Sequence, residues 1–245
     1  MMSVLLAKSL AAKGYSVLLV DADESNLGLQ RMLGTSDTPK PLMDYLGGKP
    51  ALQQKMMAAF SKKSTEPKME ILPGEQIRLA DIPPDYVVKV DSIQVVRIGK
   101  IEHTLEGCAC PMGALARDFL TKLALGEREV VVTDHEAGIE HFGRGVEQGV
   151  DTVLVIVDPS FESALLAEKI SRLATEVGAR VVVTLNRVTP EVRDALVALL
   201  AERGISVDGS VGYDPTVFEA CLTGQPLRGV QAEKEVAALV GVLGL

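Results

Sequence analysis

The strongest constraint on the fold is a set of short, β-branched apolar runs that each end at a polar residue. The runs are 16–20 before Asp21, 129–133 before Asp134, 152–157 before Asp158, and 180–185 before Asn186. Uninterrupted apolar runs of this length are typical of parallel strands covered on both faces. Helical patterns separate the runs at 3–13, 113–124, 160–177 and 190–203. The alternation predicts an α/β fold with a doubly wound, mostly parallel sheet.

The length of the chain indicates how this sheet is organised. A chain of 245 residues fits one large α/β domain, so we expect a single domain over 1–245. The segment of about 61–107 interrupts the alternation with Pro, Gly and charged residues, and only 95–98 reads as a strand there. We therefore expect a loop-rich insertion at this point of the domain.

Charge and cysteine usage exclude several classes of function. The formal net charge is -8 and there is no dense Lys/Arg cluster, so the chain is not expected to bind nucleic acid. Three cysteines are too few for a disulfide framework, which favours a reducing, cytoplasmic location. No apolar run is long enough to span a membrane. The tail 236–245 is apolar without Lys or Arg, so it reads as a packed terminal helix.

Acidic side chains stand where the predicted strands end. Asp21 and Asp23 follow the first strand and Asp134 follows another. Ligands of open α/β sheets sit at the carboxyl ends of the strands, and Mg²⁺ takes one or two carboxylates with water and phosphate oxygens. A single strand-end Asp is also a common helix cap, and for Asp21 a structural hydrogen-bonding role stays open.

These motifs resemble those of the MinD/ParA class of P-loop ATPases. Residues 20–26 are similar to switch I, and 133–140 resemble the Walker B and switch II segment, with Glu136 and Gly138 inside it. Asn186 resembles the base-contacting Asn, and Asp214-Pro215 resembles the late loop beside the base. The resemblance implies that the chain binds ATP and Mg²⁺ through these nucleotide-binding residues. It implies further that Asp23 positions the attacking water, Asp134 holds Mg²⁺ through water, and Asp21 supports the metal or switch I.

The glycine-rich loop of this class has no counterpart in the sequence. The class places Lys-Gly-Gly-x-Gly-Lys-[Ser/Thr] before its first helix, where backbone N–H groups cradle the phosphates. Here the first helical pattern starts at Met1 or Ser3. The resemblance therefore predicts an N-terminally truncated fold, with about 15 further residues encoded upstream for a short strand plus the loop. Without that loop ATP hydrolysis is in doubt.

The sequence 107–112, Gly-Cys-Ala-Cys-Pro-Met, is the most discriminating local motif. Cys108 and Cys110 offer two thiolates, half of a four-ligand site, and a two-fold dimer would complete the set. Two buried or reactive cysteines without a metal remain the alternative. Cys221, in an apolar helical stretch, reads as a packed core thiol.

The context of the cysteine pair resembles the CooC-type nickel-insertion ATPases. This resemblance implies Ni²⁺ or Zn²⁺ at Cys108 and Cys110, a homodimer, and a nickel enzyme client such as carbon monoxide dehydrogenase. The function it implies is an ATP-dependent metallochaperone. Two alternatives stay open: a MinD/ParA-type positioning ATPase, and a metal-binding paralogue that does not hydrolyse ATP.

Overall fold

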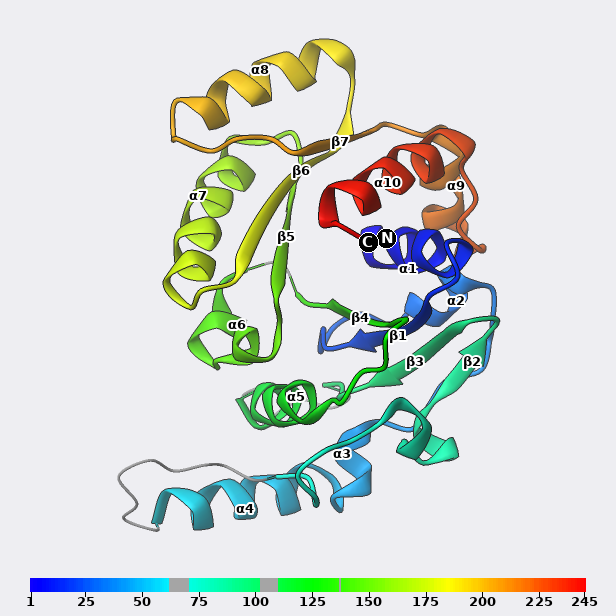
Figure 1. The fold of residues 1–245 in the computed structure, drawn as a ribbon, viewed down its shortest axis with the longest axis vertical. Helices are drawn as coiled ribbons and strands as arrows, with labels where there is room; N and C mark the ends of the chain where they lie inside the picture. Colours follow the sequence, from blue (N-terminus) through cyan, green and yellow to red (C-terminus); the bar gives the residue numbers. More distant parts are fainter. Residues whose placement is uncertain (62–70, 102–109, 137) are drawn as a thin grey trace. The chain divides into compact units, whose positions relative to one another are not determined.

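The structure is a computed structural model, and it describes residues 1–61, 71–101, 110–136 and 138–245. The chain divides into two compact units, each built from segments that are distant in the sequence (Figure 1). We call them the central unit, 15–30 with 36–149, and the terminal unit, 1–14 with 31–35 and 150–245. The expectation of a single domain over 1–245 stays a prediction.

The central unit contains a four-stranded sheet in the order β2-β3-β1-β4. Its strands are β1 (Ser16–Asp21), β2 (Val88–Val90), β3 (Ile93–Arg97) and β4 (Glu129–Asp134). Strand β1 is parallel to both neighbours, β3 and β4, and β2 joins β3 antiparallel. The side chains at 17–20 are 0% exposed, as expected for a parallel strand covered on both faces. Strand β4 is the last strand on its side of this sheet.

The helices of the central unit include one long buried helix, α5. Its helices are α3 (Leu42–Tyr45), α4 (Gly48–Ser61), η1 (Leu79–Asp81), η2 (Pro84–Tyr86), α5 (Cys110–Lys122), α6 (Glu140–Gly143) and η3 (Val146–Gly149), while the residues of α2 (Leu29–Leu33) are divided between the two units. Helix α5 begins earlier than the predicted 113–124 and holds Pro111 in its first turn, where the missing N–H costs nothing. Part of the expected insertion, 71–101, supplies β2 and β3 to the sheet.

The terminal unit contains a three-stranded parallel sheet in the order β5-β6-β7. Its strands are β5 (Thr152–Val157), β6 (Arg180–Val188) and β7 (Gly209–Gly212), and its helices are α1 (Met2–Ala12), α7 (Phe161–Glu176), α8 (Pro190–Ala201), α9 (Pro215–Thr223) and α10 (Val230–Leu243). Ser160 is the N-cap of α7, because its hydroxyl accepts the Ser163 N–H at 3.1 Å.

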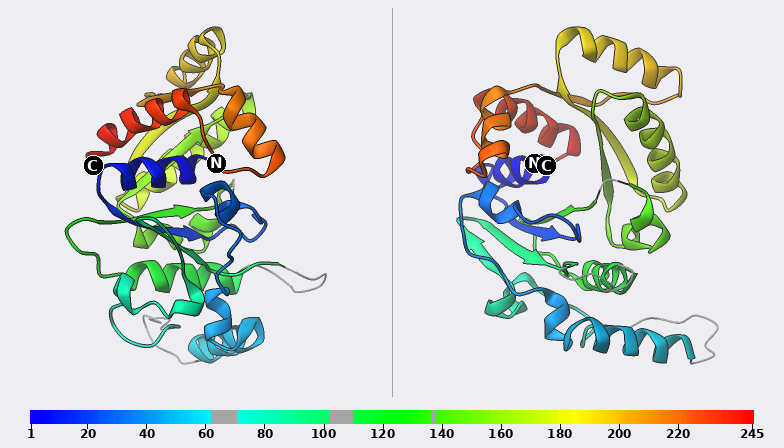
Figure 2. Two further views of the ribbon diagram at one scale, coloured as in Figure 1. Left: turned by 90° about the vertical axis from the view of Figure 1, so that its right-hand side faces the viewer. Right: turned by 180° about the vertical axis from the view of Figure 1, so that it is seen from behind.

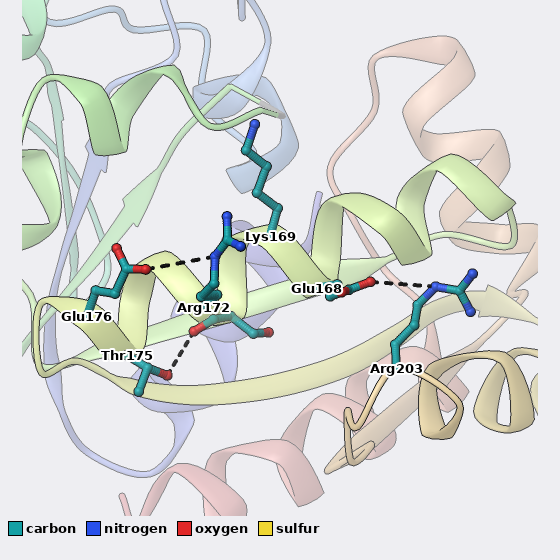
Figure 3. Close-up of a pocket in the computed structure, with 7 residues that line it drawn as sticks. Glu168, Lys169, Arg172, Thr175, Glu176 and Arg203 are labelled. Atoms are coloured by element: carbon teal, nitrogen blue, oxygen red, sulfur yellow. Dashed lines mark hydrogen bonds and ion pairs between the residues drawn. The ribbon is translucent and has the colours of Figure 1, made fainter.

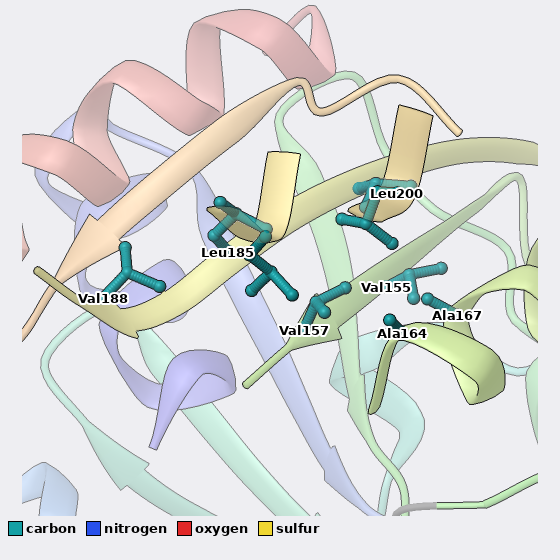
Figure 4. Packing of buried hydrophobic residues seen from close by; sticks show 9 residues of the cluster. Val155, Val157, Ala164, Ala167, Leu185, Val188 and Leu200 are labelled. Atoms are coloured by element: carbon teal, nitrogen blue, oxygen red, sulfur yellow. The ribbon is translucent and has the colours of Figure 1, made fainter. Parts of the chain in front are cut away.

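One aliphatic cluster joins α7 and α8 to β5 and β6 (Figure 4). It consists of Val155, Val157, Ala164, Ala167, Val183, Leu185, Val188, Leu196 and Leu200. Val183 and Leu185 alternate along β6, and Val188 follows after the register irregularity between Asn186 and Val188. The cluster contains no aromatic residue and is filled by Val, Leu and Ala alone.

The C-terminal tail forms the predicted packed helix. Helix α10 buries Val236, Leu239 and Val240, and it lies beside α1, with Lys8 Nζ of α1 donating to the Leu227 carbonyl at 2.7 Å (Figure 2). None of the helices in the described ranges is long and apolar enough to cross a membrane.

Two expectations differ from the structure. The strands form two sheets, because β4 pairs only with β1 and β5 only with β6 in the described part of the chain. Cys221 is exposed on α9 and is not a core thiol. Helix α9 has apolar residues on both faces, and the structure buries Val217 and Ala220 while Leu222 remains 75% exposed.

Candidate functional site

The two acidic strand ends of the central unit lie side by side. Asp21 and Asp134 are the last residues of β1 and β4, and they are in register in the parallel ladder. The Asn26 side-chain amide donates to Asp134 Oδ2 at 3.0 Å, which ties the loop after β1 to the end of β4. Asp21 and Asp134 thus end adjacent parallel strands, with Asp23 in the loop that follows β1, and their roles at a nucleotide site stay predictions.

Asp21 is 1% exposed and forms an ion pair with a buried lysine. Lys100 Nζ lies 2.7 Å from Asp21 Oδ1, and Arg97 Nε lies 4.0 Å from the other oxygen. Burial raises the pKa of Asp21 to about 6; the hydrogen bond and charge of Lys100 oppose this rise, and the charge of Asp134 adds to it. Because its carboxylate already has a cationic partner, Asp21 is poorly placed to bind a metal ion directly.

Asp23 shapes the loop that follows β1. Its Oδ1 accepts the Ser25 N–H and the Ser25 hydroxyl, both at 2.7 Å, and the Asn26 N–H at 3.1 Å. This Asx-type turn fixes one carboxylate oxygen and supports the backbone of the loop.

The segment after β4 packs back on the same loop. Arg144 Nη1 lies 2.8 Å from Glu24 Oε1, and Glu24 is 6% exposed. His135 and His141 stack with ring centroids 5.0 Å apart. Burial, and to a smaller extent the nearby His141, lower the pKa of His135 to about 4.

The two predicted switch II residues differ in their surroundings. Glu136 is exposed, and Gly138 has a φ of 146°, which side-chain-bearing residues rarely adopt. The glycine is thus required by the backbone of this segment.

The predicted base-contacting residues belong to the terminal unit. Asn186 is 5% exposed, lies two residues before the end of β6, and donates to Asp158 Oδ1 at 2.9 Å. Asp214 caps α9, where Pro215 occupies the first position, and it accepts the Thr216 N–H at 2.9 Å. The hydrogen bond from the Thr216 hydroxyl lowers the pKa of Asp214 most, and the backbone N–H donors lower it as well.

The cysteine pair is described in part. Cys110 begins α5 and is exposed, whereas Cys108 lies outside the described residues. Within the described ranges, no three His, Cys, Asp or Glu side chains come close enough to hold a metal ion. A Mg²⁺ ion at the strand ends would therefore take one or two carboxylates from the protein. Water and phosphate oxygens would be its other ligands, as is common for this ion.

The terminal unit also carries a surface hollow, lined by Glu168, Lys169, Ser171, Arg172, Thr175, Glu176 and Arg203 (Figure 3). Four of its charged side chains form two ion pairs: Arg172 lies 3.8 Å from Glu176, and Arg203 lies 3.8 Å from Glu168. None of the residues predicted for the site lines this hollow, so we do not assign the chemistry to it.

Sequence reasoning missed Lys100, Glu24 and Arg144. Lys100 stands three residues after the end of β3. Because β3 is parallel to β1, the chain leaves β3 at the same edge of the sheet at which Asp21 ends β1, and this was the signal for Lys100. That signal depends on knowing that β3 is the neighbour of β1. Glu24 and Arg144 are 120 residues apart, and only the folded chain brings them together.

Comparison with known proteins places the chain among ATP-binding proteins. No profile of a known protein family matches it. An uncharacterized ATP-binding protein of Methanocaldococcus jannaschii is 45% identical over 194 residues, which cover 79% of this chain and 76% of that protein. The carbon monoxide dehydrogenase accessory protein CooC of Rhodospirillum rubrum is 28% identical over 249 residues, covering 98% of this chain and 91% of CooC.

Solved structures of low identity share the fold. MinD in the MinC:MinD cell division complex of Aquifex aeolicus superimposes with a TM-score of 0.62 at 18% identity, covering 98% of this chain and 89% of that one. The septum site-determining protein MinD of Pyrococcus horikoshii, complexed with Mg-ADP, gives 0.61 at 16% identity, covering 99% and 90%. The chain therefore belongs to the family of the Methanocaldococcus jannaschii ATP-binding protein and has the MinD/ParA-like P-loop NTPase fold.

Proposed function

We propose that this chain is an ATP-dependent maturation factor that inserts nickel into an enzyme of the carbon monoxide dehydrogenase kind. The observation that carries the ATPase part is that Asp21 and Asp134 end adjacent parallel strands, with Asp23 in the loop that follows β1. The similarity to CooC over nearly the whole chain supports the maturation role. The protein would work as a homodimer in the cytoplasm, without nucleic acid or membrane as a partner.

The strand-end residues have distinct roles in this proposal. Mg²⁺ would neutralise charge on the transferred phosphate. Asp134 would hold it through water, and the oxygen of Asp23 not used by the turn would orient the attacking water. Asp21 supports switch I through Lys100 and does not bind the metal ion, because Lys100 already pairs with its carboxylate.

The proposed base contacts rest on Asn186, Asp214 and Pro215. Asn186 Oδ1 is buried and accepts no hydrogen bond from the described residues, which leaves it available to an amino group of a bound base. Asp214 and Pro215 fix the start of α9, so the loop before this helix is rigid enough to line the base.

The metal part of the proposal rests on Cys108 and Cys110. Each chain offers two thiolates, and a second subunit would supply the other two ligands of a Ni²⁺ or Zn²⁺ site. The cargo ion would thus be held between two copies of the chain, in a state that ATP binding favours.

A cysteine experiment tests this part directly. Replacing both residues, Cys108→Ser with Cys110→Ser, is expected to abolish Ni²⁺ uptake measured by equilibrium dialysis. Cys221→Ser is the matched control, since Cys221 is also exposed but lies on α9 of the terminal unit. Unchanged Ni²⁺ stoichiometry in the double variant would refute the metal site.

A positioning ATPase is the second candidate, because the structural neighbours include MinD and ParA proteins. Such a protein would act on a membrane or on DNA, and liposome flotation separates this candidate from the first. The net charge of -8 and the packed α10 favour the maturation role. Direct measurement of ATP binding and turnover separates both from a metal-binding paralogue that does not hydrolyse ATP.

A further inference from the structure

The chain leaving β3 runs alongside the acidic loop that follows β1. The Ile98 N–H donates to the Asp21 carbonyl at 3.0 Å, and the Ile101 N–H donates to the Glu24 carbonyl at 3.3 Å. Between these two bonds, Lys100 Nζ contacts Asp21 Oδ1 at 2.7 Å and also donates to the Asp23 carbonyl. The residue is 3% exposed, so its ammonium is held by the acidic loop and not by water.

The same segment is pressed against the first turn of α5. A Cβ at Gly99 would lie 2.7 Å from the sulfur of Met112, which is closer than real Cβ contacts come. Met112 is 1% exposed and stands two residues after Cys110, where α5 begins. Neighbouring residues 99 and 100 thus contact the cysteine helix on one side and the acidic loop on the other.

A second contact, through Arg144, also connects the acidic loop to the first turn of α5. Arg144 binds Glu24 through its guanidinium at 2.8 Å. Its aliphatic stem covers Gly113, where a Cβ would lie 3.1 Å from the Arg144 Cβ. Gly113 is in the first turn of α5, as Met112 is. Two close contacts therefore connect the acidic loop at 21–24 to one turn of one helix.

We propose that Lys100 and Arg144 are positioning residues that couple the nucleotide state of the acidic loop to the first turn of α5 at Cys110. The proposal rests on the proposed function, which places ATP and Mg²⁺ beside this loop. Close-packed contacts pass on a displacement that a loose contact would absorb. A movement of 21–24 on ATP binding or hydrolysis therefore shifts the first turn of α5 and changes the surroundings of Cys110.

The test measures the alkylation rate of Cys110 by iodoacetamide in the full chain carrying Cys108→Ser and Cys221→Ser. The rate is taken without nucleotide, with Mg-ADP, and with Mg²⁺ and a non-hydrolysable ATP analogue at saturation. We expect the analogue to change the rate by about fivefold or more, the low end of ordinary coupling. Lys100→Met and Arg144→Met should each reduce this change to about twofold or less while the nucleotide still binds.

Two further variants separate coupling from a general loss of structure. Lys122→Met removes a lysine at the far end of α5, where its ammonium lies 3.2 Å from Asp118, and it should leave the nucleotide response intact. Arg144→Lys keeps the charge and the stem and should restore most of the response. If Lys100→Met fails to fold, the comparison of Arg144→Met with Arg144→Lys tests the coupling.

The outcomes distinguish the inference from the function on which it rests. A chain that binds no nucleotide in direct titration overturns both. If nucleotide binds but the Cys110 rate does not change, the coupling is wrong and the ATP site stands. The coupling is equally wrong if the rate responds to the same extent in the parent and in Lys100→Met or Arg144→Met.

Discussion

At the scale of single residues, the pairing of Asp21 with Lys100 is the most demanding feature of the site. Both side chains are nearly inaccessible, at 2% and 1% exposure, so each charge depends on the other. Removing one partner of a buried pair typically costs about 3–5 kcal/mol, since the remaining charge is left without compensation. The raised pKa of Asp21 shows that Lys100 offsets only part of the cost of burial.

Asp23→Ala tests the proposed water-positioning role. The variant should bind Mg-ATP in equilibrium titration, while its turnover falls by about 10²-fold or more, as expected for loss of a positioned proton acceptor. Asp85→Ala is the control, because Asp85 is an exposed carboxylate of the same unit that pairs with Lys40. Normal turnover in Asp23→Ala would remove Asp23 from the mechanism.

His135→Gln tests the effect of burying an imidazole. The pKa of His135 falls from 6.5 to about 4, chiefly through burial. Between these values the unfolded chain binds a proton that the folded chain does not, so the free energy of unfolding decreases as the pH drops from 6.5 towards 4. His135→Gln has no imidazole at this position, so it lacks the part of this decrease that His135 causes.

Urea denaturation at two pH values measures the difference. Between pH 7 and pH 4.5, the stability lost by His135→Gln should be smaller than that lost by the parent by about 2 kcal/mol. Any change in packing affects both pH values alike and cancels in the comparison. Equal acid losses in the two proteins would show that His135 does not stay neutral in the fold.

At the scale of elements, the strand ends could be predicted from sequence and the strand partners could not. Apolar runs that stop at Asp21, Asp134 and Asn186 are local patterns, and the structure confirms strands there. The pairing of β3 with β1 is a long-range choice, so Lys100 remained hidden within an expected insertion. In the short helix α9, apolar residues lie on both faces, and the prediction that Cys221 is a core thiol is wrong because the structure exposes it.

Leu200→Ala tests the packing of α8 against the three-stranded sheet. Leu200 is 0% exposed in the cluster of α7, α8, β5 and β6, and its truncation should destabilise the protein by about 2–5 kcal/mol in guanidinium unfolding. Leu165→Ala on α7 is the control: this side chain is 43% exposed, and its loss should cost about 0.5 kcal/mol or less. Similar losses for both would mean that α8 does not pack as described.

At the scale of the whole molecule, the predicted fold class is confirmed, and the predicted roles of the individual site residues stay predictions. The polar strand ends and the order of the motifs were sufficient to place the chain in the MinD/ParA-like fold. The sequence did not reveal that the strands form two sheets, because β4 and β5 resemble interior strands in composition. An apolar composition indicates that both faces of a strand are covered, but it does not indicate which strands pair with its two edges.

The central claim is that one protein links ATP to a thiophilic metal ion. The most direct measurement is the Ni²⁺ affinity of the unmodified chain by isothermal titration, with and without saturating Mg²⁺ and a non-hydrolysable ATP analogue. Coupling of ordinary strength predicts that the analogue changes the Ni²⁺ dissociation constant by about fivefold or more. An identical Ni²⁺ dissociation constant in the two conditions, with the analogue demonstrably bound, would contradict the account.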